Sequence, residues 1–336
     1  MRVTLPEALI PLVLRARNAN RPFVTEQGAH DRIRERFLRP VQYGPPARLE
    51  GVRVDRRLSD PTEWPVYDVR PVGSARPEAA SSSVVVYVHG GGWVNEITGP
   101  HWKLIARIAR ETGQRVVVPI HPLVPLGTAR DVRDGVVDLV RREEGSGCAV
   151  RMAGDSSGGQ IVLSAVLALR DDGRVLPSTV LLSPALDLTW SNPLIDEVQP
   201  GDPWLGRPGG RVLAEAWRGD DSLEDPAVSP LFGDMAGVGP LTILSGTHDV
   251  LNPDAHVLGE KAQAAGVQVT LHEAEGQLHV FALLPTEVGD QGARRIIEAL
   301  RPDQRGPGRR GPCRRGPCRR GPSQRGPGQR GPDQTS

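Results

Sequence analysis

The sequence predicts an α/β protein with a mostly parallel central sheet and helices on both faces. Short apolar runs alternate with longer segments of helical periodicity, and this alternation is typical of βα units in a parallel sheet. Because most of these runs lack the apolar–polar alternation of a half-exposed strand, we expect both faces of the sheet to be covered. The runs of this type are Val84–Val88, Arg115–Ile120, Cys148–Ala153, Thr179–Ser183 and Leu241–Ser245.

The remaining regular elements complete this arrangement. Two alternating runs, Ala47–Arg53 and Trp64–Val72, predict an antiparallel hairpin at the start of the sheet. A last strand is predicted at Val267–His272. Helices are predicted at Trp102–Thr112, Ala129–Arg142, Gln160–Arg170, Pro253–Ala265 and Gly292–Leu300.

Two segments interrupt the alternation. Residues 1–45 have amphipathic helical patterning, which is typical either of a surface helix pair or of a lid over a pocket. Residues 188–238 are rich in turns and hold one helical stretch, Arg211–Arg218, so they read as an insertion at the strand ends. Three tryptophans lie in the insertion, and they would either wall a pocket or form its own small core: Trp190, Trp204 and Trp217.

The charge of the chain is unevenly distributed. Ten arginines and two aspartates follow residue 300, a net charge of +8, so the first 300 residues carry −7 in a chain of net charge +1. Residues 301–336 repeat Arg-Gly-Pro six times with almost no hydrophobic surface, which predicts a disordered tail. The tail has no aromatic residue to stack on bases, so we expect no nucleic-acid partner despite its basic charge.

Cysteine content and hydropathy bear on the location of the protein. Cys148 lies in a predicted buried strand and is interpreted as a small apolar filler, whereas Cys313 and Cys318 lie in the tail with no histidine nearby. Without a disulfide framework, a reducing, cytoplasmic location is expected. The apolar stretch near residue 10 follows Glu7 and is broken by Pro11, which argues against a signal peptide, and no apolar run reaches membrane-spanning length.

The segment Gly154–Gly159 carries the sharpest chemical signal. It reads Gly-Asp-Ser-Ser-Gly-Gly between a predicted strand and a predicted helix, which is the Gly-x-Ser-x-Gly nucleophile elbow. Side chains at the flanking positions of so tight a turn would collide, so glycine is needed there. We therefore expect Ser156 to be exposed above the strand ends, with the backbone N–H of Ser157 beside its hydroxyl.

A nucleophilic serine also needs oxyanion donors, a base and an acid. His89-Gly90-Gly91-Gly92 ends a predicted strand, and its three glycines would let backbone N–H groups face a site; no Lys-Ser/Thr follows, so a P-loop is excluded. Among eight histidines, His279 stands out because it lies just past the last predicted strand. Asp249 follows a strand and is the preferred acid, with Asp187 as the alternative.

Four segments together resemble the hormone-sensitive-lipase-like family of α/β-hydrolases, the bacterial esterases with a His-Gly-Gly-Gly motif. They are His89–Trp93, Gly154–Gly159, Ser245–Leu251 and Leu278–Phe281. The resemblance implies an α/β-hydrolase catalytic domain over residues 46–300, with Asp249 as the acid and a helical cap formed by residues 1–45 and the insertion at 188–238. Two positions depart from the family: Ser157 replaces an alanine, and His121-Pro122-Leu123 replaces a segment with a tyrosine–arginine pair.

The sequence therefore predicts a serine carboxylic-ester hydrolase acting on small to medium acyl esters. In this hypothesis Ser156, His279 and Asp249 form the triad, Gly91, Gly92 and Ser157 donate to the oxyanion, Gly90 shapes the loop, and no metal or organic cofactor is needed. The alternatives are an acetyl-amide or lactone hydrolase with the same triad and a non-catalytic binder of small molecules. The expected partner is a small-molecule ester; a homodimer is one option that the sequence leaves open.

Overall fold

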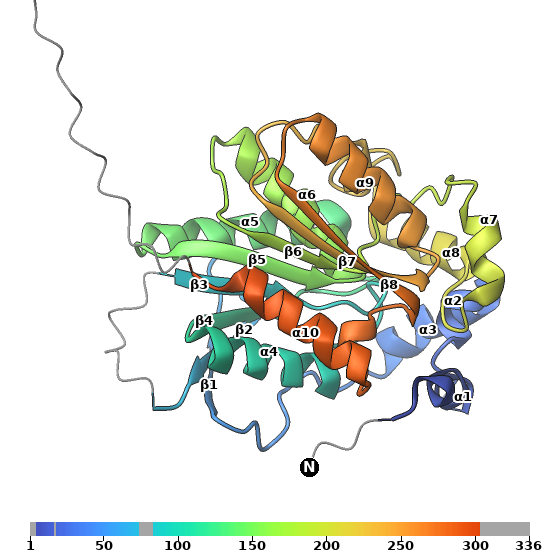
Figure 1. Cartoon of the computed structure of the whole chain (residues 1–336), viewed down its shortest axis with the longest axis horizontal. Coiled ribbons are helices and arrows are strands. Elements are labelled where there is room, and N and C mark those ends of the chain that lie inside the picture. The colour runs from blue at the N-terminus through green and yellow to red at the C-terminus, as the bar shows by residue number, and fades with distance from the viewer. Residues whose placement is uncertain (1–4, 17, 74–82, 303–336) are drawn as a thin grey trace, which may run out of the picture. The chain divides into compact units, whose positions relative to one another are not determined.

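The computed structural model describes residues 5–16, 18–73 and 83–302 (Figure 1). The predicted Arg-Gly-Pro tail, with Cys313 and Cys318, lies outside these described residues. Within them an eight-stranded sheet forms the centre, with the strand order β1-β2-β4-β3-β5-β6-β7-β8. Its strands are β1 (Val52–Leu58), β2 (Pro65–Pro71), β3 (Ser83–Val88), β4 (Arg115–Pro119), β5 (Ala149–Asp155), β6 (Thr179–Leu182), β7 (Leu241–His248) and β8 (Val269–Leu278).

The sheet is mixed but mostly parallel. Strand β2 pairs antiparallel with β1 and β4, and every other neighbouring pair is parallel. In parallel strands the carboxyl ends meet at one edge, so the loops after β3, β5, β7 and β8 gather there. This confirms the fold class predicted from the alternating runs.

Helices cover both faces of the sheet, as Figure 1 shows. Helices α4 (Gly99–Thr112) and α10 (Glu287–Leu300) lie on one face, and α5 (Ala129–Gly145), α6 (Ser157–Asp171) and α9 (Asn252–Ala264) lie on the other. Side chains of β3 alternate between two cores: Val85 and Tyr87 pack with the first pair of helices, and Val84, Val86 and Val88 pack on the opposite face. Both sides of the strand are buried, which is why its sequence reads as one apolar run.

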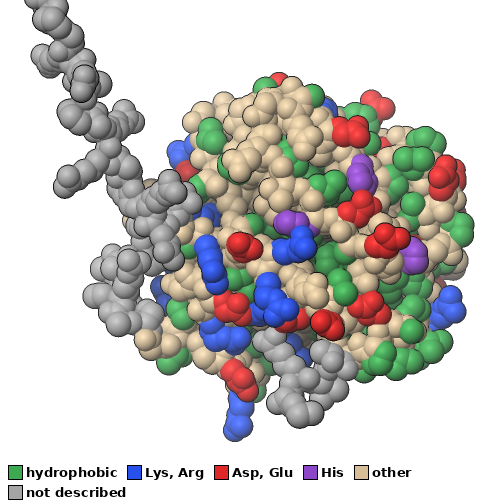
Figure 2. All heavy atoms as spheres, in the orientation of Figure 1, with side chains coloured by type: hydrophobic (Ala, Val, Ile, Leu, Met, Phe, Trp, Pro, Cys, Tyr) green, Lys and Arg blue, Asp and Glu red, His purple; other side chains and the backbone are tan. Residues whose placement is uncertain are grey.

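The outer surface of α4 and α10 carries charges of both signs. Figure 2 shows acidic and basic side chains interspersed on this face of the molecule. Arg107 pairs with Glu111 and Asp290 at 2.6 Å each, and Arg294 also reaches Asp290 at 2.6 Å. Arg107 is itself buried, whereas Arg294 is exposed, and an exposed pair such as Arg294–Asp290 contributes at most about 1 kcal/mol to stability. This face therefore presents no patch of a single sign.

The two segments that interrupted the sequence pattern meet beyond the carboxyl ends of the strands (Figure 1). The first folds into α1 (Ile10–Ala16), α2 (Arg21–Val24) and α3 (Glu26–Leu38), and the second contains α7 (Ile195–Val198) and α8 (Arg207–Arg218). Helix α8 packs so closely on α2 that a side chain at Gly209 would come within 2.4 Å of the Phe23 backbone. Short 3-10 turns occur at Glu7–Leu9, Gln199–Gly201, Pro230–Phe232 and Phe281–Leu283.

Three local predictions need correction. The first hairpin strand begins at Val52 and not Ala47, because Gly51 has a positive φ of 70° and turns the chain into the ladder. The N-terminal region forms three helices and not a pair, since Thr25 caps a new helix by accepting a bond from Gly28 N. Cys148 lies one residue ahead of β5 and is half-buried, so it packs against the margin of the core and does not lie in a buried strand.

Candidate active site

The turn at Ser156 has the strained geometry of a nucleophile elbow. Ser156 adopts φ 54° and ψ −123° between the end of β5 and the start of α6. A side chain at Gly154 would lie 2.5 Å from the Gly158 carbonyl oxygen, and one at Gly158 would lie 2.2 Å from that of Val88. Only glycine fits these two positions, which explains the motif. The surrounding packing must hold the Ser156 backbone in its strained conformation.

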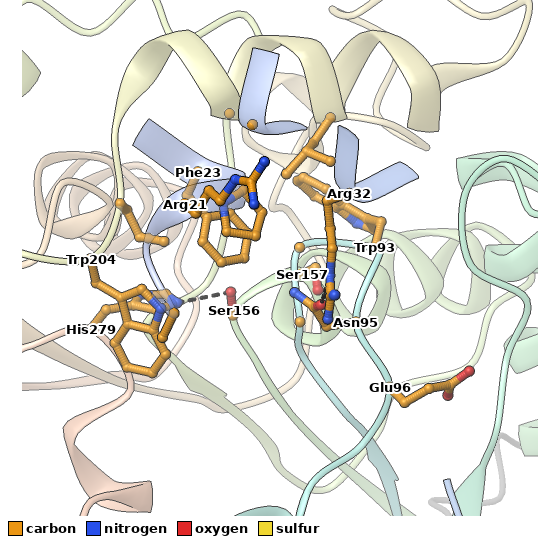
Figure 3. Close-up of a pocket in the computed structure, with 18 of the residues that line it drawn as sticks. Arg21, Phe23, Arg32, Trp93, Asn95, Glu96, Ser156, Ser157, Trp204 and His279 are labelled. Atoms are coloured by element: carbon orange, nitrogen blue, oxygen red, sulfur yellow. Dashed lines mark hydrogen bonds between the residues drawn. The ribbon is translucent and has the colours of Figure 1, made fainter. Parts of the chain in front are cut away.

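Ser156, His279 and Asp249 form a continuous hydrogen-bonded chain. The Ser156 hydroxyl donates to His279 Nε2 at 2.9 Å (Figure 3), and His279 Nδ1 donates to Asp249 Oδ2 at 2.9 Å. Asp249 directly follows β7, and His279 follows β8, so the parallel sheet delivers all three side chains to one edge. The structure therefore brings together the three residues that the sequence singled out.

The surroundings of His279 favour its protonated form. Burial by itself lowers the pKa of this imidazole, but the carboxylates of Asp249, Asp202 and Asp155 outweigh that effect and raise the pKa above its ordinary value. Asp249 is fully buried, and its second oxygen accepts the Leu251 backbone N–H at 3.0 Å. The acid is thus held at both oxygens, which fixes the orientation of the imidazole.

The alternative acid and most of the other histidines have partners elsewhere. Asp187 accepts bonds from Thr189 and Ser191 within its own turn, and it makes none to His279. His272 on β8 contacts Arg295, and His256 on α9 lies 3.1 Å from Glu273. The structure places none of these side chains against Ser156.

The glycine loop after β3 packs directly against the nucleophile. A side chain at Gly90 would lie 2.9 Å from Ser156 Cβ and 2.3 Å from Asp155 Oδ2. Gly91 and Gly92 have positive φ values of 134° and 61°, which favour glycine. Both line the same cavity as Ser157, the first residue of α6, so backbone donors from two segments border one space.

A second buried network, which sequence reasoning missed, supports this loop. Asp155 accepts a bond from Tyr87 at 2.7 Å and one from His101 Nε2 at 3.1 Å. His101 had no recognisable context in the sequence, although its place three residues after Thr98 fits a helix cap. Because these bonds outweigh the effect of burial, the pKa of Asp155 falls below its usual range.

His121 stands at a position where the chain departs from the resembled family. Its ring stacks on that of His89 with 4.6 Å between centroids. Nδ1–H of His89 donates to Gly90 O, and Nδ1–H of His121 donates to Pro122 O. Burial lowers the pKa of both imidazoles, so the pair is neutral near pH 7. At this position the chain therefore has an aromatic ring that packs on His89 and supports the glycine loop.

A cavity of about 830 Å³ opens above Ser156 (Figure 3). Phe23, Trp204 and Leu213 contribute apolar wall, and Arg32 donates to Asn95 Oδ1 at 2.8 Å on another side. The three tryptophans of the insertion were predicted either to wall a pocket or to form a small core, and both roles occur. Trp190 and Trp204 line the cavity, whereas Trp217 is buried, stacks on Trp93 and donates to Gln160.

The donor types present suit acyl transfer better than metal binding. Across the described ranges, no three His, Cys, Asp or Glu side chains converge in a way that would hold a metal ion. The cavity instead presents a serine, an imidazole and glycine-rich backbone, which are the groups that nucleophilic catalysis uses.

Comparison with known proteins agrees with this geometry. The family described as alpha/beta hydrolase fold matches residues 85–283. A triacylglycerol lipase of Mycobacterium tuberculosis is 32% identical over 232 residues, which is 68% of this chain and 48% of that protein. An esterase of Acinetobacter venetianus is 27% identical over 231 residues, 65% of this chain and 76% of its own. The chain thus spans about half the length of the mycobacterial relative.

Solved structures show the same likeness. An esterase from the bacterial hormone-sensitive lipase family superimposes with a TM-score of 0.74 and 26% identity, covering 89% of this chain and 98% of that one. None of the helices in the described part of the chain is long and apolar enough to cross a membrane. With the fold, the elbow and the family match in agreement, the chain belongs to the α/β-hydrolase family, among esterases and lipases of the hormone-sensitive-lipase type.

Proposed function

We propose that the protein is a serine carboxylic-ester hydrolase that works through an acyl-enzyme intermediate. The observation that carries this proposal is the bonded chain from Ser156 through His279 to Asp249, open to a cavity at the serine. His279 Nε2 takes the hydroxyl proton as Ser156 Oγ attacks the ester carbonyl carbon. Asp249 holds the tautomer that leaves Nε2 free and stabilises the imidazolium that forms.

The glycine loop would stabilise the negative charge of the tetrahedral intermediate. Backbone N–H groups of Gly91, Gly92 and Ser157 are the proposed oxyanion donors, and Gly90 allows the loop to approach the serine. His279 then returns its proton to the leaving alcohol as the C–O bond breaks. A water molecule, deprotonated by the same imidazole, attacks the acyl carbon, and the acid product leaves with Ser156 restored.

The shape of the cavity supports esters with small to medium acyl groups. Its volume of about 830 Å³ lies within the usual range for small-molecule pockets, and aromatic side chains form part of its wall. We further propose that residues 1–45 and 188–238 act as the cap, because α2 and α8 contact each other above the serine. Acetyl amides and lactones remain alternative substrates, since they react through the same intermediate.

The first experiment is Ser156→Ala, assayed on p-nitrophenyl acetate, butyrate and octanoate. We expect turnover to fall by about 10⁴-fold or more, because no other group would form the acyl-enzyme. Ser146→Ala, at an exposed position after α5, is the matched control and should keep full activity. Undiminished turnover by the Ser156 variant would refute the mechanism.

A second assay separates the three substrate classes. Wild-type turnover is compared on an ester, an amide and a lactone of matched acyl size. A higher kcat/KM on the amide or the lactone would replace the ester assignment while keeping the triad. Ligand binding to wild type without turnover of any of the three would favour the non-catalytic binder.

A further inference from the structure

Asp202 joins two segments that both contact the triad. It lies between the 3-10 turn Gln199–Gly201 and α8, and its side chain is half-buried. Oδ1 accepts the backbone N–H of Trp204 at 2.7 Å and that of Leu205 at 3.0 Å. Oδ2 accepts the backbone N–H of Val250 at 3.0 Å, 48 residues further along the chain. A single carboxylate therefore ties the insertion to the loop that carries the acid.

Both segments held by Asp202 touch the His279 ring. Trp204 presents its ring edge-on, with 5.7 Å between centroids and an interplanar angle of 88° (Figure 3). Val250 immediately follows Asp249, whose carboxylate binds His279 Nδ1. The imidazole is thus confined by an indole on one side and a carboxylate on another, and Asp202 fixes the backbone that bears each of them.

We propose that Asp202 is a positioning residue for ester hydrolysis, which clamps Trp204 and the Asp249 loop together and so holds the His279 ring in line with Ser156. The proposal rests on the proposed function, because it assigns Asp202 a part in that reaction. Asp202 acts through these two segments, because its carboxylate bonds to the backbone of Trp204, Leu205 and Val250 and not to Ser156 or His279 in the described structure. Small displacements of a base are costly, since a shift of about 1 Å can lower a rate by about 100-fold.

The charges around Asp202 give the clamp a measurable signature. Asp249 and His279 face Asp202 from the ends of β7 and β8. On the other side, His248 lies beside Gly201, the residue before Asp202. The charge of Asp155, at the end of β5, also raises the pKa of His279. Burial and the negative charge of Asp249 raise the pKa of Asp202 to about 6. Above that pH Asp202 carries a negative charge beside the Asp249 carboxylate. This arrangement disfavours folding, so a role in stability alone does not account for Asp202.

Asp202→Asn isolates the contact with Val250. The amide oxygen of asparagine can still accept from Trp204 and Leu205, but its NH₂ group would face the Val250 N–H, which needs an acceptor. We expect kcat on p-nitrophenyl acetate to fall by about tenfold with little change in KM. Asp202→Ala also frees Trp204 and Leu205, which line the cavity, so this variant should raise KM as well.

The pH profile separates a positioning role from a structural one. The negative charge of Asp202 helps to raise the pKa of His279, so its removal should move the acid limb of kcat/KM to lower pH. At the same time Asp202→Asn should unfold at an equal or higher temperature than wild type at pH 7. Lower turnover, an acid-shifted profile and undiminished stability together are the expected result.

Asp196→Asn is the matched control. It removes the same charge from the same insertion at an exposed carboxylate that pairs with Arg207, and it should change none of these quantities. The proposal is overturned if Asp202→Asn keeps the wild-type kcat and acid limb, or if its loss of turnover only follows a loss of folded protein. Failure of the proposed function itself would appear differently, as wild-type protein that does not hydrolyse the ester.

Discussion

Two buried histidine–aspartate pairs lie close to Ser156, and only one of them is placed to act as a base. His279 and Asp249 are joined at 2.9 Å, and His101 and Asp155 at 3.1 Å. The second nitrogen of His279 reaches the Ser156 hydroxyl, whereas that of His101 accepts bonds from Thr98 at the start of α4. A base needs a free nitrogen that faces the reacting group, and His101 has none. The comparison shows that a buried pair alone does not identify a catalytic histidine.

The pKa values of the histidines also differ between the two sides of Ser156, the side of His279 and the side of His101. On the His279 side, neighbouring carboxylates raise the pKa of the imidazole and leave it able to exchange a proton near neutral pH. On the His101 side, burial lowers the pKa of the nearby His89 and His121, so they remain neutral. We infer that one side moves protons and the other keeps the glycine loop in shape.

The largest effect is expected for His279→Gln. Loss of the imidazole bonded to Ser156 should lower kcat/KM on p-nitrophenyl esters by about 10⁴-fold or more, since the serine then loses its proton acceptor. Circular dichroism confirms that the variant is folded. Activity within tenfold of wild type would mean that the two histidines had been assigned to the wrong roles.

Asp249→Asn should lower kcat by about 10³- to 10⁴-fold. The asparagine NH₂ group would donate where His279 Nδ1–H needs an acceptor, and the ring would turn or change tautomer so that Nε2 no longer accepts from Ser156. Asp187→Asn is the matched control, because that carboxylate bonds only within its own turn in the described chain. If the control loses activity and Asp249→Asn does not, the alternative acid is the correct one.

His101→Gln should mainly affect stability. The change weakens a hydrogen bond to the buried Asp155 carboxylate, which is worth about 2 kcal/mol of the free energy of unfolding, while turnover should stay within tenfold of wild type. Urea unfolding measures the first quantity, and steady-state kinetics measure the second. A loss of turnover comparable with that of His279→Gln, at unchanged stability, would erase the distinction between the two pairs.

These contrasts define what the sequence could predict. Ser156, Asp249 and His279 each follow a strand in the parallel part of the sheet, so its topology alone brings them together. His101 lies on a helix and follows no such rule, and the position of His121 after a strand does not reveal that its ring stacks on His89. Their contacts depend on how α4 and the loop after β4 pack beneath Asp155, and no local pattern encodes that packing. The N-terminal helices were similarly ambiguous, because amphipathicity predicts a buried face without naming the surface that buries it.

On the acid side, hydrolysis should depend chiefly on the ionisation of His279, which the neighbouring Asp202, with a pKa of about 6, modulates. Neutral His279 is the active form and its pKa is raised, so kcat/KM should reach half its maximum above pH 6.5 and fall about tenfold for each unit below that point. His89 and His121 stay neutral in this range and should add no second step. A pH–rate profile from 5 to 9 tests this, and a flat profile between pH 5 and 7 would argue against His279 as the base.

The smallest effect is expected for His121→Phe. Nε2 of His121 is buried and has no hydrogen-bond partner in the described structure, so exchanging the imidazole for a benzene ring removes one unsatisfied atom and one weak bond to Pro122 O at 3.2 Å. Stacking on His89 should persist, because the interaction needs only an aromatic face. The free energy of unfolding should therefore change by about 1 kcal/mol or less, and kcat by less than about threefold. A larger fall in kcat at unchanged stability would show that the imidazole does more than brace the glycine loop, and that the two sides of Ser156 are less separate than their hydrogen bonds indicate.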